Sequence, residues 1–198
     1  RRQRQMCIRD RQYQQLLRQF GGHRRIADKV NEVAHLYERF KMSAKSRDLY
    51  RYVTQTWPTS DGGAAALTQE IRLNILLRDR AGYEAALAKA QGAMAENKEV
   101  ARAVREAADY CYKKKYYDYA KELYQVVVDT WPLGDQECMA QSYLICRRIG
   151  EGDLEAAATT VADLQSRFAQ DTHLPEALRN IAGEYRLKAR HDLALALY

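Results

Sequence analysis

Cysteine and histidine are the side chains best suited to metal binding and nucleophilic catalysis, and four cysteines stand in the sequence. Cys7, Cys111, Cys138 and Cys146 form no CxxC pair and no Cys/His cluster with ligand spacing, so no zinc site and no cofactor are expected. Cys138 and Cys146 would lie about 12 Å apart along one helix at 1.5 Å per residue, beyond the ~7 Å that a disulfide allows between Cα atoms. The spacing favours four unpaired thiols.

The four histidines, His23, His35, His173 and His191, lie far apart in the sequence without a partnered serine, cysteine or aspartate. The pattern therefore favours packing over catalysis for these residues. No glycine-rich phosphate loop is present, because the Gly-Gly pairs at 21–22 and 62–63 stand alone. The sequence predicts neither an enzyme nor a small-molecule substrate.

One cluster combines basic and aromatic residues, and it comprises Lys113, Lys114, Lys115, Tyr116 and Tyr117. Interleaved cations and rings can stack on single-stranded nucleic acid. The favoured alternative is that the lysines lie at the C-terminal end of a helix, where positive charge complements the helix dipole, while Tyr117 packs in the core.

The net charge of +6 is concentrated near the start of the chain. Residues 1–51 hold 14 Lys and Arg against 5 Asp and Glu, and residues 1–11 alone hold five Arg. Without residues 1–11, 27 basic residues face 25 acidic ones, so the body is close to neutral and nucleic acid is an improbable partner. No stretch of about eighteen apolar residues is present, so no membrane span is expected. We interpret residues 1–11 as a tail outside the fold.

A repeat organises the rest of the chain. LYRYVTQTWP at 49–58 returns as LYQVVVDTWP at 123–132, which is 74 residues later, and aromatic residues recur at half that interval. Those on the 37-residue spacing are Tyr13, Tyr50, Tyr124 and Tyr198, together with Phe20, Trp57, Trp131 and Phe168. A period of this size is typical of stacked helix–turn–helix units, so the sequence predicts an all-α solenoid.

The segment CYKKKYYDYAKELYQVVVDTWP resembles the second half of a tetratricopeptide repeat (TPR), a family with large, small and aromatic residues at set positions. The matching positions are Ala107, Ala108, Cys111, Tyr117, Ala120, Tyr124, Val127 and Pro132. In the preceding unit we match Leu73, Asn74, Leu77, Tyr83, Ala86, Ala90 and Ala93. Small residues such as Ala34, Ala108 and Ala182 are expected where two helices approach closely.

The resemblance covers residues 12–198 and implies a right-handed superhelix of about five helix pairs, truncated at both ends. The expected helices are 12–20, followed by the pairs 25–42/45–57, 64–80/82–96, 99–114/117–130, 136–149/153–168 and 174–189/191–198. Unit spacings of 37, 40, 34, 37 and 37 depart from a strict 34, Lys115 replaces the usual turn glycine, and Arg148 stands where Tyr or Leu is usual. The Trp-Pro endings are most similar to bacterial cell-envelope members, whereas unpaired cysteines suit a cytoplasm, so the compartment stays open.

In TPR proteins the first helix of each pair, helix A, lines a concave groove that binds peptides. The corresponding positions here are Asn31, His35, Glu38, Arg39, Ile71, Ile75, Arg78, Asp79, Arg102, Arg105, Asp109, Tyr112, Lys113, Ser142, Cys146, Arg179, Gly183 and Arg186. No Lys–Asn pair of the chaperone-binding members is present among them. Their arginines could hold an acidic peptide, and a solvated mixed-charge face is an equal alternative.

The resemblance therefore implies a non-catalytic scaffold that binds a peptide or partner protein through its helix-A face. Two alternatives stay open: a helical-repeat RNA-binding protein, and the docking arm of a larger enzyme.

The two tryptophans are predicted to be structural. Trp131 should end its helix against the next helix A, near Met139 and Tyr143, with Pro132 stopping the helix behind it. Trp57 should do the same one pair earlier, so both rings should be buried and neither should be a binding platform.

Overall fold

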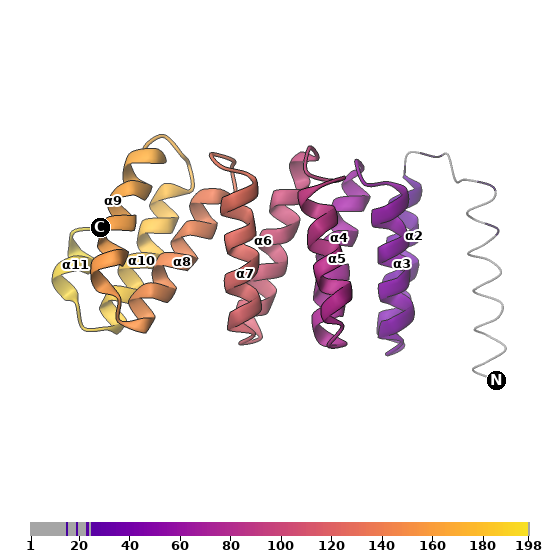
Figure 1. The fold of residues 1–198 in the computed structure, drawn as a ribbon, viewed down its shortest axis with the longest axis horizontal. Helices are drawn as coiled ribbons and strands as arrows, with labels where there is room; N and C mark the ends of the chain where they lie inside the picture. The colour runs from indigo at the N-terminus through magenta and orange to yellow at the C-terminus, as the bar shows by residue number, and fades with distance from the viewer. Residues whose placement is uncertain (1–14, 16–18, 20–22, 24, 198) are drawn as a thin grey trace. The chain divides into compact units, whose positions relative to one another are not determined.

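The structure is a computed structural model, and it describes residues 15, 19, 23 and 25–197. All regular secondary structure in this part of the chain is helical (Figure 1). The helices are α2 (Ile26–Arg39), α3 (Ser43–Thr56), α4 (Asp61–Leu76), α5 (Arg80–Gln91), α6 (Lys98–Lys113), α7 (Tyr117–Thr130), α8 (Glu137–Glu151), α9 (Leu154–Arg167), α10 (Leu174–Leu187) and α11 (His191–Leu195). The predicted tail over 1–11, Cys7, and most of the helix expected over 12–20 fall outside the described residues.

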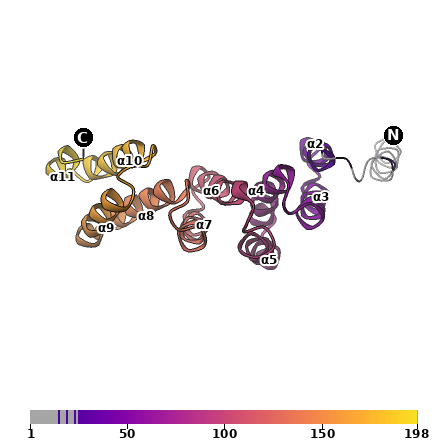
Figure 2. The same ribbon diagram turned by 90° about the horizontal axis from the view of Figure 1, so that it is seen from above.

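The helices form two compact units that meet in sequence between Ala103 and Val104, inside α6. In the first unit α3 packs against α2 and α4, α4 packs against α5, and α2 also contacts α4. Figure 2 shows α2 and α4 in one layer and α3 and α5 in the other. In the second unit α8 packs against α7, α9 and α10, while α11 packs against α10. Each unit therefore has the predicted arrangement of helix pairs.

The turn inside each pair repeats every 37 residues. The second helix of the pair, helix B, starts at Ser43, Arg80, Tyr117, Leu154 and His191. Two residues before each start, the chain adopts positive φ, at Lys41, Arg78, Lys115, Gly152 and Ala189. In the first turn Met42 N–H donates to Tyr37 O at 3.0 Å, and the same bond recurs in the other four turns at 2.8–3.0 Å. This six-to-one bond across a left-handed residue is the Schellman motif, which ends a helix and satisfies its last carbonyls.

The constant turn corrects the predicted alignment of the second pair. That alignment placed Leu77 with Cys111, but Leu77 caps the end of α4 and is 38% exposed, and the residue 37 before Cys111 is the buried Asn74. Helix α4 starts at Asp61 rather than 64 because Ser60 caps it, accepting from Gly63 N–H at 2.9 Å. The repeat length is therefore 37 residues throughout, and the predicted spacings of 40 and 34 around this pair are wrong.

Core residues follow the same spacing. On the A helices Ala34, Ile71, Ala108, Ile145 and Ala182 are each fully buried, which confirms close packing at the three predicted alanines. On the B helices the buried set is Ser46, Tyr83, Ala120, Ala157 and Ala194. Tyr83, and not the predicted Ala86, is thus the counterpart of Ala120.

The three described cysteines are unpaired, as predicted. Cys111 is a buried core residue on α6, and Cys138 and Cys146 lie on α8. Burial raises the pKa of each thiol to about 12, so all three are protonated at neutral pH.

The tryptophans end their helices as predicted, but the expectation that both are buried is wrong. Trp57 and Trp131 are the residues that cap the ends of α3 and α7, each followed by a proline, and both are only half-buried. Trp57 contacts Tyr52 edge to face, with ring centroids 5.6 Å apart, and packs against the core of the first unit. The buried counterparts at this position are Met94 and Phe168.

Candidate functional site

The predicted groove residues of the first unit divide into packed and exposed side chains. Ile75 is only 6% exposed, so its assignment to the groove is wrong. Asn31 is half-buried and donates to Gly62 O at 2.8 Å, which ties α2 to α4. Arg78 is the left-handed turn residue. His35 is exposed and contacts the Tyr50 ring edge to face at 5.8 Å.

Arg39, Arg78 and Arg102 are the exposed cations of this set. Arg102 pairs with Glu99 one turn earlier on α6. Arg39 ends α2 and has no ion pair with another described residue.

In the second unit, two of the predicted groove residues belong to an internal network. Arg105 donates to Asp109 at 2.6 Å and to Gln136 at 2.6 Å, while the Tyr124 hydroxyl donates to the other Asp109 oxygen at 2.6 Å. Burial, and then the Asp109 carboxylate, raises the pKa of Tyr124 well above its usual range. Arg105 and Asp109 therefore hold helices together and are already partnered. Lys113, Arg179 and Arg186 are exposed and form no ion pair with a described residue.

An ion network that the sequence analysis missed lies inside the first unit. Glu70 on α4 has a side chain 1% exposed; it receives bonds from Lys89 at 2.6 Å and Thr54 at 2.7 Å, and from Arg51 at 3.3 Å. The residues at the same position of later repeats are Ala107, Leu144 and Ile181. An acidic residue in a column of apolar ones was the signal that could have revealed the network.

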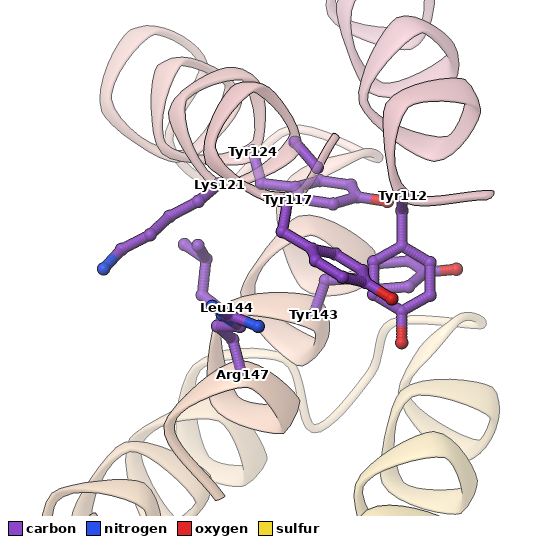
Figure 3. Close-up of a pocket in the computed structure, with 8 residues that line it drawn as sticks. Tyr112, Tyr117, Lys121, Tyr124, Tyr143, Leu144 and Arg147 are labelled. Carbon is purple, nitrogen blue, oxygen red and sulfur yellow. The ribbon is translucent and has the colours of Figure 1, made fainter. Parts of the chain in front are cut away.

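A hollow on the described surface lies in the second unit, between α7 and α8 and beside the end of α6 (Figure 3). Its empty volume is about 270 Å³. The lining residues are Tyr112, Tyr117, Ala120, Lys121, Tyr124, Tyr143, Leu144 and Arg147, which we call the tyrosine pocket.

Ring contacts fix the walls of the tyrosine pocket. Tyr124 and Tyr143 stack with centroids 4.6 Å apart and planes at 10°. Tyr112 contacts Tyr143 at 5.4 Å and Tyr117 at 5.7 Å, and the Arg147 guanidinium lies over the Tyr117 ring at 5.3 Å. Each such aromatic contact contributes roughly 0.5–1.5 kcal/mol beyond burial, so the rings hold one another in place.

Part of this pocket was predicted from the sequence. Tyr112 was expected on the groove face, and the structure shows Tyr112 44% exposed at the pocket wall. Tyr124 is buried. Tyr117 was expected in the core, but it is 39% exposed, so that prediction is wrong. Tyr143, Lys121, Leu144 and Arg147 were not predicted to act together, because they approach one another only when α8 packs on α7.

The five residues of the basic–aromatic cluster at 113–117 are all exposed. Lys113 is the last residue of α6, as the dipole argument predicted, and Lys115 is the left-handed turn residue. Lys114 lies over the Tyr110 ring at 6.0 Å, and Tyr116 precedes α7.

The described residues include no group of three His, Cys, Asp or Glu side chains placed to hold a metal ion. Among the described helices, none has the length and apolar character needed to cross a membrane.

No protein-family model matches the chain, and a search of curated proteins finds no match. Solved structures are similar in fold. The TPR-like repeats of a putative kinesin light chain from Podosopora anserina superpose with a TM-score of 0.52 at 14% identity, over 88% of this chain and 92% of that one. BtubC (BKLC) from P. vanneervenii gives a TM-score of 0.57 at 15% identity, over 98% of this chain and 87% of that one. The chain has a TPR-like helical-repeat fold.

In TPR terms the tyrosine pocket lies between helix B of one pair, α7, and helix A of the next pair, α8. Tyr112 is the member shared with the predicted helix-A groove set. The other seven lining residues lie outside that set, so the family resemblance alone did not indicate this hollow.

Proposed function

We propose that the chain is a non-catalytic scaffold that binds a peptide or a partner protein, acidic in character, through the exposed side chains of its A helices. The proposal rests on the exposure and the lack of ion pairs of four basic side chains on these helices. Arg39, Lys113, Arg179 and Arg186 stay exposed without an ion pair to a described residue, while apolar side chains of the same helices fill the core. Unpaired surface cations attract acidic partners and speed their association.

Peptide selection tests the proposal. A library of random displayed peptides is passed over the purified chain, and the enriched peptides are then titrated by calorimetry. We expect acidic peptides to be enriched and their affinity to fall as salt rises. Reversing charge in the double variant Arg179→Glu, Arg186→Glu should weaken acidic peptides that bind near α10. Arg148→Glu is the matched control, because Arg148 is exposed but donates to Thr160 at 2.6 Å. Failure to enrich any peptide would contradict the proposal.

The RNA-binding alternative is separated by a second measurement. Binding of single-stranded RNA by the same preparation is measured at two salt concentrations. The near-neutral body predicts weak binding, and tight, strongly salt-dependent binding would favour the alternative instead.

The bacterial source of the chain and its possible place in a larger enzyme are predictions from the sequence. The Trp57-Pro58 and Trp131-Pro132 endings are the reason to expect a bacterial source, and the docking-arm alternative concerns sequence beyond the present chain.

A further inference from the structure

The tyrosine pocket is a shallow hollow at the surface. Its empty volume of about 270 Å³ includes space open to solvent, so the hollow does not enclose a ligand. Ala120 contributes a small side chain to the lining, and four tyrosines and Leu144 supply apolar surface. A single side chain would therefore pack against the exposed rings of Tyr112 and Tyr117 beside the hollow (Figure 3).

The charge of the lining is positive on one side. Lys121 and Arg147 are the charged lining residues, and Figure 3 shows them across from the Tyr112 ring. Lys121 has no ion pair with a described residue, and Arg147 pairs with Glu151 at 2.9 Å while lying over Tyr117. From the other side, Glu184 on α10 acts on Tyr112: burial first, and then this carboxylate, raises the pKa of the Tyr112 hydroxyl.

Tyrosine walls alone would also suit a cationic ligand, since cations bind over aromatic faces. Here the Tyr117 face already receives the Arg147 guanidinium, and Lys121 adds a second positive charge to the lining. A further cation would be repelled by both. The lining instead favours an uncharged aromatic group, which can pack against the exposed tyrosines, with carboxylates beside it.

From these contacts we propose that the tyrosine pocket binds a single aromatic side chain of an acidic peptide segment, with the flanking carboxylates beside Lys121 and Arg147. This inference rests on the proposed scaffold function and specifies the peptide chemistry at one site.

The test uses three synthetic pentapeptides with blocked ends, titrated into the full chain by calorimetry. The probe is Glu-Asp-Phe-Asp-Glu, and the controls are Glu-Asp-Ala-Asp-Glu and Lys-Lys-Phe-Lys-Lys. We expect the probe to bind about tenfold more tightly than either control, because one control lacks the ring and the other carries the wrong charge. Equal affinity for all three peptides, or no binding of the probe, would overturn the proposal.

Two pairs of neighbouring residues provide matched variants. Tyr117→Ala removes a pocket wall, and Tyr116→Ala removes an equally exposed ring that is not part of the lining, at 39% and 41% exposure. Arg147→Gln removes a lining charge, and Arg148→Gln removes the adjacent charge outside it. We expect each pocket variant to weaken the probe by about three- to tenfold and each control to stay within about twofold.

Two further measurements guard against misfolding and against confusion with the broader proposal. Thermal melts followed by circular dichroism show whether each variant is folded, and Tyr117→Phe, which keeps the ring, should retain binding. If Tyr117→Ala and Tyr116→Ala weaken the probe equally, the pocket assignment is wrong. If selected peptides bind the chain but do not respond to Tyr117→Ala or Arg147→Gln, the scaffold function stands and the pocket proposal fails.

Discussion

Glu70 shows how one residue can depart from a repeat and still be accommodated. A buried carboxylate without partners would cost several kcal/mol, and its place in an apolar column leaves no water to solvate it. Lys89 and Arg51 supply the positive charge, and Thr54 donates a further hydrogen bond, so the carboxylate is paired on both oxygens. Removing Lys89 or Arg51 would leave the buried Glu70 carboxylate with only one cationic partner. The network therefore links α3, α4 and α5 of the first unit through polar contacts as well as apolar ones.

At the end of helix B, the same position of the repeat carries a half-buried aromatic residue in two repeats and a fully buried one in another. Trp57, Trp131 and Phe168 occupy the same place in three of the repeats, at the end of helix B. Phe168 is 4% exposed, whereas both tryptophans are half-buried. We expect Phe168→Ala to cost roughly 3–5 kcal/mol of the free energy of unfolding, the range for a buried aromatic residue. Trp57→Ala and Trp131→Ala should cost less, about 1–3 kcal/mol, because part of each ring already contacts water.

Urea melts of the three variants measure these costs, and Tyr116→Ala, with an exposed ring, serves as the near-neutral control. A cost for Trp131→Ala equal to that of Phe168→Ala would show that the first prediction of a buried ring was closer to the truth. A near-neutral Trp131→Ala would instead place this ring on a free surface.

At the scale of the element, the turn between the two helices of a pair carries strain at four of its five occurrences. Lys41, Arg78, Lys115 and Ala189 adopt φ between 56° and 64°, a region that costs an ordinary residue roughly 1 kcal/mol and costs glycine nothing. Gly152 alone has the residue type that the geometry favours. The motif forms in every case because its backbone bonds and the packing of both helices outweigh that cost.

Lys115→Gly and Ala189→Gly should therefore stabilise the chain by roughly 0.5–1 kcal/mol, despite the greater freedom of glycine in the unfolded state. The converse variant Gly152→Ala should destabilise it by about 1 kcal/mol. Thermal and urea unfolding measure all three, and an exposed helix position such as Ala158→Gly is the control, expected to lose about 1 kcal/mol. Destabilisation by Lys115→Gly would indicate that the lysine side chain contributes more to the turn than its backbone strain removes.

Helices were well predicted from the sequence because their signals are local. Ala120, Tyr124 and Val127 repeat at helical spacing, and all three are buried on α7 as expected. The error at Leu77 arose because matching by residue type slipped by three residues, while the turn kept its 37-residue interval and placed the polar Asn74 at this position. Ser60 and Gly63, which set the true start of α4, form a local cap that was overlooked.

The site was harder to predict than the fold. Exposure on helix A was predicted from the TPR resemblance for Arg39, Lys113 and Arg186, but Arg105 and Asp109 proved to be partnered by Gln136 before α8 and Tyr124 on α7. Such contacts depend on how two helices pack, and no local pattern encodes them. The tyrosine pocket has the same origin: it exists only where Tyr143 stacks on Tyr124.

At the scale of the whole molecule, contacts stay close in sequence. Every pair of described helices with extensive contact is adjacent or next but one along the chain, as in α3 with α4 or α8 with α10. The stability of such repeats is approximately a sum of local terms, so a defect should be felt mainly where it is made. The separate cores of the two units allow a direct comparison.

Substitutions at Leu73 and Leu164 allow the two units to be compared. Both side chains are fully buried, Leu73 in the core of the first unit and Leu164 in the core of the second. Leu73→Ala and Leu164→Ala should each cost roughly 2–5 kcal/mol locally. We expect hydrogen exchange, followed by mass spectrometry, to speed up across α2–α5 in the first variant while α8–α10 keep their protection. The second variant should show the reverse pattern. Equal acceleration of exchange in both units by either substitution would contradict this prediction. It would show that the chain unfolds as one cooperative body, with a coupling free energy through α6 larger than the stability lost at the substituted site.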